Sequence, residues 1–179
     1  NGTGHSLEDR LIAAVLVGRR DEDGVQQIAV AHGRSDKLDD FARARGLGLH
    51  LVAHAGEEGP PAYIESALAV LHVERIDHGV RTLESPSLTA RLARERVPLT
   101  VCPLSNIKLR VFDTLAAHNL PALLAAGLAA TINSDDPAYF GGYIGENYRA
   151  SARGLGLGRD ELIQLARNSI TASFLDDTA

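Results

Sequence analysis

The sequence has one cysteine, no methionine and no tryptophan among its 179 residues. A single cysteine cannot form an internal disulfide, which excludes a small secreted fold held together by disulfides. No apolar run approaches the roughly 20 residues of a membrane-spanning helix, and residues 1–10 contain no apolar signal-peptide core. We therefore predict a cytoplasmic protein with no membrane partner.

Positive charge is also scarce. The 18 Lys and Arg residues against 23 Asp and Glu give a net charge of -5. Nucleic-acid-binding proteins rely on a broad basic surface, so this balance argues against a nucleic-acid partner. The hydrophobic content of 45% is ample for a core at this length. With no internal repeat or linker, the sequence predicts a single domain over residues 1–179.

Short apolar runs alternate with amphipathic segments along the whole chain. The expected strands are Leu11–Val17, Ile28–Ala31, Leu47–His54, Arg75–His78, Leu99–Cys102 and Ala129–Asn133. The expected helices cover residues 36–45 and 61–73, begin at Ser85 and at Pro121, and include a face over residues 162–170. This alternation predicts an α/β fold with a parallel sheet. Six strands fit either an open doubly wound sheet or most of a (β/α)₈ barrel, because a complete barrel takes at least about 200 residues.

Polar side chains gather where four of the expected strands end. These residues are His54, Glu57, Asp77, His78, Ser105, Asn106, Asp135 and Asp136. Parallel α/β sheets and barrels place their sites at this edge, so the ordered set predicts a functional site there.

Each of these residues alone also has a structural explanation. His54 suits a metal ligand, or a strand-end imidazole bonded to a backbone carbonyl. Glu57 suits a general acid or base, or the cap of the next helix. His78 suits a position over a ligand, or a plain turn. Asp135 and Asp136 suit a metal and a ligand contact, or an Asx turn before Pro137.

Other conspicuous residues are expected to be structural. We expect Cys102 to be a small buried hydrophobe, and His50 to lie deeper on the face of the strand that carries His54. No Walker-type phosphate loop occurs, and the stretches Gly141-Gly142 and Gly154–Gly158 are expected to be turns.

Four motifs occur in a fixed order: HAGEEGPPAYIESAL, ERIDHGVR, PLTVCPLSNIKL and NSDDPAYFGGYIGENY. Together they resemble the adenosine/adenine deaminases of the amidohydrolase superfamily, and the SDDPAYFGGY form most resembles the bacterial adenine deaminases. The resemblance runs from about Leu47 to Phe174. It implies a metal-dependent (β/α)₈ TIM barrel with one Zn²⁺ per complete site. The implied reaction converts adenine to hypoxanthine and releases ammonia.

The resemblance also implies a role for each site residue. His54 and Asp135 match zinc ligands of the family, and Glu57 matches the residue that passes a proton to the purine ring. His78 is similar to the residue that orients and helps deprotonate the metal-bound water, and Asp136 to one that hydrogen-bonds the purine. The implied partner is a small free purine, which agrees with the absence of a basic patch.

The chain departs from the family pattern near its start. The family's first strand ends in an H-x-H pair that supplies two more zinc ligands, and no H-x-H occurs here. By resemblance, Leu11–Val17 matches the third barrel strand and Ile28–Ala31 the fourth. The chain would then be the C-terminal three-quarters or so of a barrel that lacks its first two strands.

Several alternatives follow from this departure. The chain is the ordered part of a complete deaminase, or it associates with a partner, such as a second copy, that completes the barrel. A third alternative is a catalytically inactive remnant that serves as a binding or assembly module. Within the enzyme class, adenosine or another substituted adenine is the alternative substrate.

Overall fold

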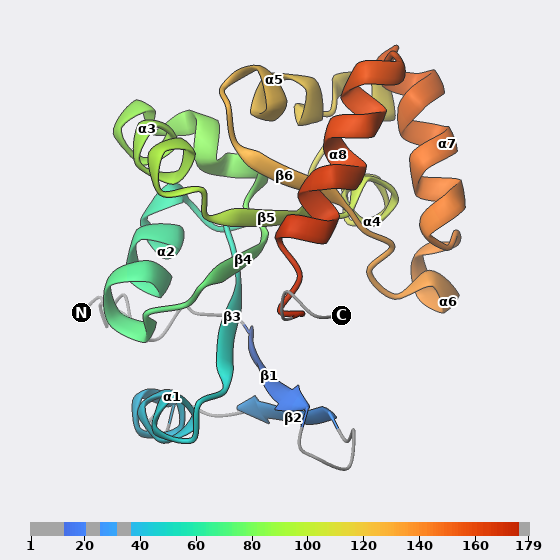
Figure 1. Cartoon of the computed structure of the whole chain (residues 1–179). Helices are drawn as coiled ribbons and strands as arrows, with labels where there is room; N and C mark the ends of the chain where they lie inside the picture. The colour runs from blue at the N-terminus through green and yellow to red at the C-terminus, as the bar shows by residue number, and fades with distance from the viewer. Residues whose placement is uncertain (1–12, 21–25, 32–36, 176–179) are drawn as a thin grey trace, which may run out of the picture.

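The computed structural model describes residues 13–20, 26–31 and 37–175 (Figure 1). Its strands are β1 (Ala13–Arg20), β2 (Gln26–Ala31), β3 (His50–Ala55), β4 (Arg75–His78), β5 (Pro98–Val101) and β6 (Ala129–Ile132). Its α-helices are α1 (Lys37–Gly46), α2 (Pro61–Ser66), α3 (Pro86–Glu95), α4 (Pro103–Lys108), α5 (Leu120–Ala125), α6 (Pro137–Phe140), α7 (Ile144–Leu155) and α8 (Arg159–Thr171). Short helical turns are η2 (Ala67–Leu71), η3 (Val80–Glu84) and η4 (Leu115–Ala117). None of the described helices is long and apolar enough to span a bilayer.

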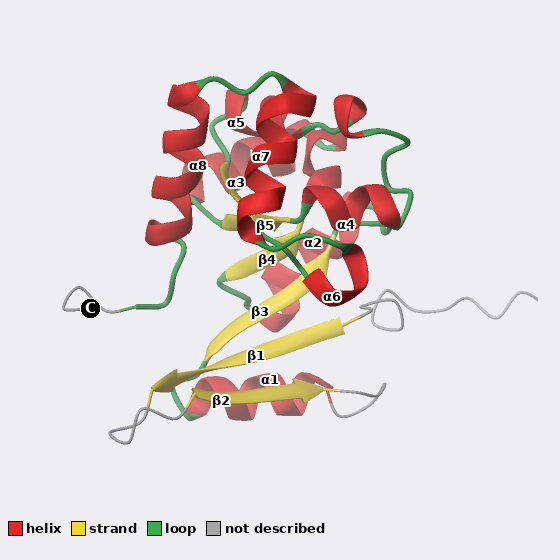
Figure 2. Cartoon of the chain, turned by 90° about the vertical axis from the view of Figure 1, so that its right-hand side faces the viewer, coloured by secondary structure: helices red, strands yellow, loops and turns green. Residues whose placement is uncertain are grey.

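All six strands form one sheet in the order β2-β1-β3-β4-β5-β6. The four strands from β3 to β6 run parallel to one another. Figure 2 shows these strands in succession, with most of the helices gathered around β4 to β6 and with β1, β2 and α1 at the opposite end. The α/β prediction is therefore confirmed, with the parallel part of the sheet built from the last four of the six expected strands.

The expectation of a fully parallel sheet is wrong for the first two strands. β1 pairs antiparallel with both β2 and β3. Only residues 21–25 separate β1 from β2, whereas a parallel pair needs a crossover of about a dozen residues or more. These two strands therefore do not take the places of consecutive parallel barrel strands. The part of the predicted strand at Leu11 and Ile12 lies outside the described residues.

The helices between the parallel strands form where proline and capping signals predict them. Pro61 begins α2 and Pro86 begins α3. The hydroxyl of Ser85 caps α3 by accepting a hydrogen bond from the Leu88 amide. Leu88 and Leu92 lie one turn apart on the buried face of α3 and pack into the core. The expected helix starts at Ser85 and Pro121 are thus confirmed to within a residue or so.

The glycine stretches form turns as expected, except that Gly154 and Leu155 belong to helix α7. It spans Ile144–Leu155 and contains two glycines, Gly145 and Gly154. Its buried side chains are polar, Asn147 and Ser151, and Asn147 accepts a hydrogen bond from the Leu104 amide of α4. Glu, Arg, Ala and Leu make up half of this helix, and the Asn147 hydrogen bond joins it to α4. Gly156, at a φ of 66°, ends it.

Candidate functional site

The parallel register places polar side chains in one row across the sheet. His54 pairs with Asp77, Asp77 with Thr100, and Thr100 with Thr131. Residues paired in register point to the same face of a sheet. The row therefore brings a polar face to the carboxyl ends of β3, β4, β5 and β6, where the sequence predicts a site.

A cavity of about 230 Å³ opens beside this row. It is lined by His54, Asp77, His78, Thr100, Cys102, Asn133 and Asp135. Two of these residues, His78 at a φ of 65° and Asp135 at a φ of 56°, adopt the left-handed backbone region. Left-handed backbone is uncommon outside glycine and is concentrated at functional sites. Three of the five predicted site residues thus share one cavity.

His54 reaches the cavity with one ring nitrogen buried and without a hydrogen bond. Its Nδ1 has no hydrogen-bonding partner among the described residues, and the nearest carboxylate oxygen, Oδ2 of Asp77, lies 3.4 Å away. Asp77 is itself held by Thr100, whose hydroxyl donates to Oδ1 at 2.5 Å. His54 therefore stands between a carboxylate on one side and the cavity on the other.

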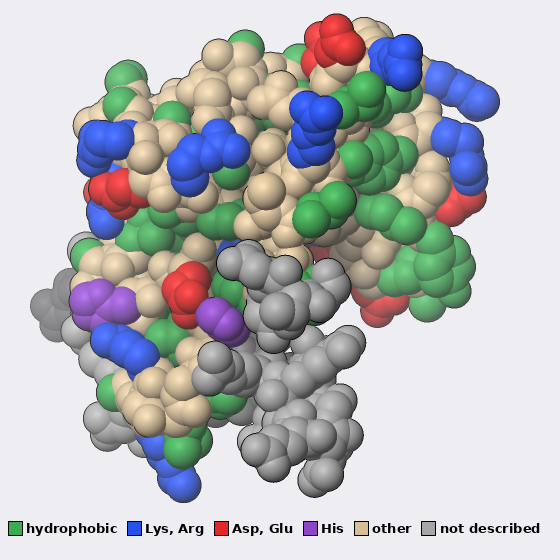
Figure 3. Space-filling view, viewed as in Figure 1, with side chains coloured by type: hydrophobic (Ala, Val, Ile, Leu, Met, Phe, Trp, Pro, Cys, Tyr) green, Lys and Arg blue, Asp and Glu red, His purple; other side chains and the backbone are tan. Residues whose placement is uncertain are grey.

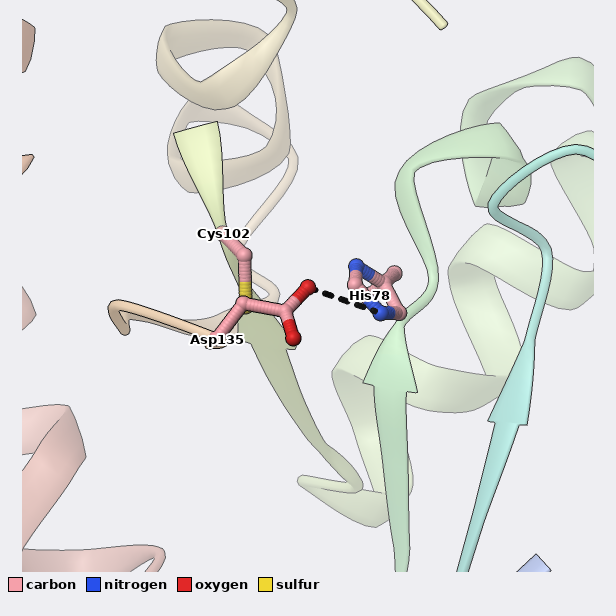
Figure 4. Close-up of side chains that lie close together, drawn as sticks. All are labelled: His78, Cys102 and Asp135. Atoms are coloured by element: carbon pink, nitrogen blue, oxygen red, sulfur yellow. Dashed lines mark ion pairs between the residues drawn. The ribbon is translucent and has the colours of Figure 1, made fainter. Parts of the chain in front are cut away.

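His78 and Asp135 face each other across the cavity, as Figure 4 shows. Nε2 of His78 lies 3.9 Å from Oδ2 of Asp135, and the same oxygen accepts a hydrogen bond from the Ser105 hydroxyl at 2.7 Å. Burial, followed by repulsion from nearby His54, lowers the pKa of His78 to about 4. The His78 imidazole is therefore neutral at physiological pH and can accept a proton.

Glu57 approaches His78 from the loop after β3. Its Oε1 lies 3.2 Å from Nδ1 of His78 and accepts a hydrogen bond from Nδ2 of Asn106 at 2.7 Å. Burial raises the pKa of Glu57 from 4.5 to about 7 despite the opposing effect of the Asn106 hydrogen bond. A substantial fraction of Glu57 is thus protonated near neutral pH. The glycine before it, Gly56, has a φ of 68°, and a Cβ there would overlap Ile64.

Asp136 lies apart from this group. Its Oδ1 accepts hydrogen bonds from the amides of Ala138 and Tyr139 at 3.0 and 3.1 Å, and so caps α6. The side chain is exposed and is not among the residues that line the cavity. The structure thus brings together His54, Glu57, His78 and Asp135, whereas the Asp136 carboxylate makes the Asx-type contact around Pro137 that the sequence left open and thereby caps α6.

The donor set of the cavity fits a zinc ion. Ligand atoms of His78, Cys102 and Asp135 all lie within 4.8 Å of one another. His54 lines the same cavity, and its buried Nδ1 has no hydrogen-bond partner among the described residues. The imidazole nitrogens of His54 and His78 and the carboxylate oxygen of Asp135 are ligand types that proteins use for zinc. Burial, then the nearby carboxylates, raises the pKa of the Cys102 thiol, so Cys102 is a neutral, buried group, as predicted.

Some residues of the site carried no assigned role in the sequence. Asp77, Ser105 and Asn106 were visible at strand ends but had no specific function, and His118 gave no signal at all. Their contacts reach across 23 to 49 residues of chain, except for the His118 to Asn106 contact, which spans 12. His50 is confirmed as structural, since it pairs with Glu74 at 2.8 Å and stacks on Phe174.

A parallel α/β sheet with imidazole and carboxylate groups at its carboxyl edge is the architecture of metal-binding barrels. The family model for adenosine deaminase matches residues 10–179. The chain therefore belongs to the adenosine deaminase family.

The matched relatives agree with this assignment. The chain is 69% identical over 137 residues to an adenine deaminase of Albidiferax ferrireducens, covering 76% of this chain and 40% of the relative. It resembles the crystal structure of adenine deaminase from Arthrobacter aurescens with a TM-score of 0.78 and 51% identity, covering 83% of this chain and 46% of that one. These proteins are adenine deaminases of bacteria, as the SDDPAYFGGY motif predicted.

Two further structures show what relatives bind. An amidohydrolase from Burkholderia ambifaria with bound Zn has a TM-score of 0.73 and 29% identity, over 83% of this chain and 43% of that one. An Arabidopsis relative solved with IMP has a TM-score of 0.68 and 27% identity, over 79% of this chain and 41% of that one. The chain spans less than half the length of the relatives it matches.

Proposed function

We propose that this chain carries the later half of the active site of a zinc-dependent adenine deaminase, which hydrolyses adenine to hypoxanthine and ammonia. The observation that carries the proposal is the convergence of His54, Glu57, His78 and Asp135 at the carboxyl edge of β3 to β6. Residues 1–179 would form one domain of that protein. On the face drawn in Figure 3, the Lys and Arg side chains are separated by other side chains and form no broad basic patch, which suits a small purine better than a nucleic acid.

Proton transfer is assigned to the two residues with opposite pKa shifts. Glu57, with a pKa of about 7 because of burial, can give a proton to a purine ring nitrogen. His78, whose pKa burial lowers to about 4, can accept one from an attacking water and pass it to the departing amine, which leaves as ammonia. A general acid and a general base held 3.2 Å apart meet the two proton needs of hydrolysis at an amino-substituted ring carbon.

His54 and Asp135 are the proposed zinc ligands. The Asp135 carboxylate is fixed by Ser105, and the His54 ring is flanked by Asp77. Zinc bound there would lower the pKa of a water molecule to about 7 and supply hydroxide at neutral pH. A catalytic zinc usually takes three protein ligands, so this chain's two assigned ligands form part of a site.

Adenine is preferred as substrate because the SDDPAYFGGY motif and the most similar relatives point to it. Asp136 would contact the purine through the carboxylate oxygen that does not cap α6. Adenosine or another substituted adenine is the alternative substrate.

The test is a steady-state comparison of adenine and adenosine with metal analysis of the same sample. We expect about one zinc per complete site and a higher kcat/KM on adenine. Glu57→Gln should keep the zinc and lose at least about a hundredfold in kcat, because it removes the proton donor. A higher kcat/KM on adenosine would identify adenosine as the substrate in place of adenine. A zinc-free, inactive protein would favour the binding or assembly module. The partial coverage of its relatives motivates that second candidate.

A further inference from the structure

A chain of hydrogen bonds leads from the start of α5 to Glu57. The amide of Leu120 donates to Nδ1 of His118 at 3.1 Å, and Nε2 of His118 lies 3.2 Å from Oδ1 of Asn106. Nδ2 of Asn106 then donates to Oε1 of Glu57 at 2.7 Å. These hydrogen bonds join three segments, namely residues 118–120, Asn106 in α4, and Glu57 after β3.

The donor and acceptor of each of these hydrogen bonds follow from the first donor, the backbone amide of Leu120. A backbone amide can only donate, so Nδ1 of His118 must accept and cannot carry a proton. Burial lowers the pKa of His118 to about 4, which keeps the ring neutral. The single ring proton must then be on Nε2, and it is donated to Oδ1 of Asn106.

His118 therefore determines which way the Asn106 amide faces. Asn106 is fully buried, and with its oxygen held by His118 it must turn Nδ2 toward Glu57. The same Nδ2 lies 3.4 Å from Nδ1 of His78. In the flipped orientation, Nδ2 of Asn106 would face the Nε2 proton of His118, and this buried donor would be left without an acceptor.

We propose that Asn106 and His118 are positioning residues, which hold the Glu57 carboxyl beside His78 without touching the substrate. The inference rests on the proposed function of Glu57 and deepens it. Neither residue lines the cavity of the candidate site. His118 is 3% exposed and packs at 4.4 Å between ring centroids on Phe112, so its ring is fixed by packing as well as by hydrogen bonds.

Substitutions at His118 separate the hydrogen bond from the packing. His118→Phe keeps an aromatic ring against Phe112 but removes the Nε2 proton, and kcat on adenine should fall about tenfold with little change in KM. His118→Gln keeps an amide donor near the place of Nε2 and should restore most of kcat. Asn106→Asp replaces the donor facing Glu57 with an acceptor, and kcat should fall about a hundredfold or more.

Asn168→Leu is the matched control for the loss of a buried amide. Nδ2 of Asn168 donates to the carbonyl of Ala130 at 2.7 Å, on the side of β6 that α8 covers. The control should lower the melting temperature but leave kcat and KM unchanged. A fall in kcat equal to that of His118→Phe would assign the effect to general destabilisation and overturn the proposal.

NMR of the ¹⁵N-labelled protein tests the arrangement without any turnover. We expect the Asn106 side-chain amide protons to be protected from exchange in the unaltered protein and in His118→Gln, and to lose that protection in His118→Phe. Unchanged protection in His118→Phe would overturn the proposal, as would lost protection with unchanged kcat. A protein that shows the protection but deaminates nothing would refute the proposed function and retain the arrangement.

Discussion

Replacement of Glu57 with glutamine should make the metal-free protein more stable at alkaline pH. Burial raises the pKa of Glu57 from 4.5 to about 7, so the folded state holds this proton where the unfolded chain has lost it. Between pH 4.5 and 7 the folded state thus binds more protons than the unfolded state, and stability falls as the pH rises. Glutamine does not titrate, so the stability of Glu57→Gln does not fall with pH for this reason.

The magnitude follows from the pKa change. The difference between 4.5 and about 7, at about 1.36 kcal/mol per pKa unit, gives an upper figure of about 3 kcal/mol. The Glu57 side chain is 18% exposed, and solvent screening reduces the expected gain to about 2 kcal/mol. Glutamine retains an oxygen that can accept the hydrogen bond from Asn106, so no buried donor is left without a partner.

Urea unfolding of both proteins in EDTA at pH 4 and pH 8 measures this gain. The free energies of unfolding should nearly agree at pH 4, and Glu57→Gln should be the more stable protein at pH 8. The opposite pH dependence of His78, whose pKa burial lowers to about 4, is common to both proteins and largely cancels in the difference. An equal difference at the two pH values, or a more stable unaltered protein at pH 8, would refute the reasoning.

Three more predictions concern the metal and α6. Asp77→Asn should weaken zinc binding about tenfold to a hundredfold in a chelator competition, since Asp77 is placed to orient His54; unchanged affinity would exclude that role. Asp135→Ala should release zinc during dialysis while Ser105→Ala retains it, because Ser105 only supports the carboxylate; zinc retained by Asp135→Ala would contradict the ligand assignment. Asp136→Ala should lower the free energy of unfolding by about 1 kcal/mol and Asp136→Ser should restore it, as for a helix cap; equal stability of the two variants would exclude the cap.

The sequence predicted the site residues that follow strands directly. His54, His78 and Asp135 stand at or just after the ends of β3, β4 and β6, and parallel strands bring their ends to one edge whatever the details of packing. The roles of Asn106 and His118 could not be predicted in this way. The contact between Asn106 and His118 depends on how α4 packs against the start of α5, and no local sequence pattern predicts that packing.

The main error in the predicted fold is the direction of β1 relative to β2 and β3. An apolar run such as Ile28–Ala31 predicts a strand but does not say which way it runs. The short connection between β1 and β2 did carry that information, because residues 21–25 include Asp23-Gly24, a dipeptide typical of hairpin turns. Helix α7 was not predicted, because Gly145 and Gly154 interrupt its helical pattern and the contact of Asn147 with α4 depends on tertiary packing.

Zinc-edge anomalous diffraction from crystals of the protein grown with zinc tests the central claim most directly. We predict one strong peak in the cavity at the carboxyl ends of β3 to β6, at coordination distance, about 2.0–2.2 Å, from a nitrogen of His54 and a carboxylate oxygen of Asp135. Zinc bound only elsewhere on the protein, or no zinc in crystals of a protein that deaminates adenine, would contradict it.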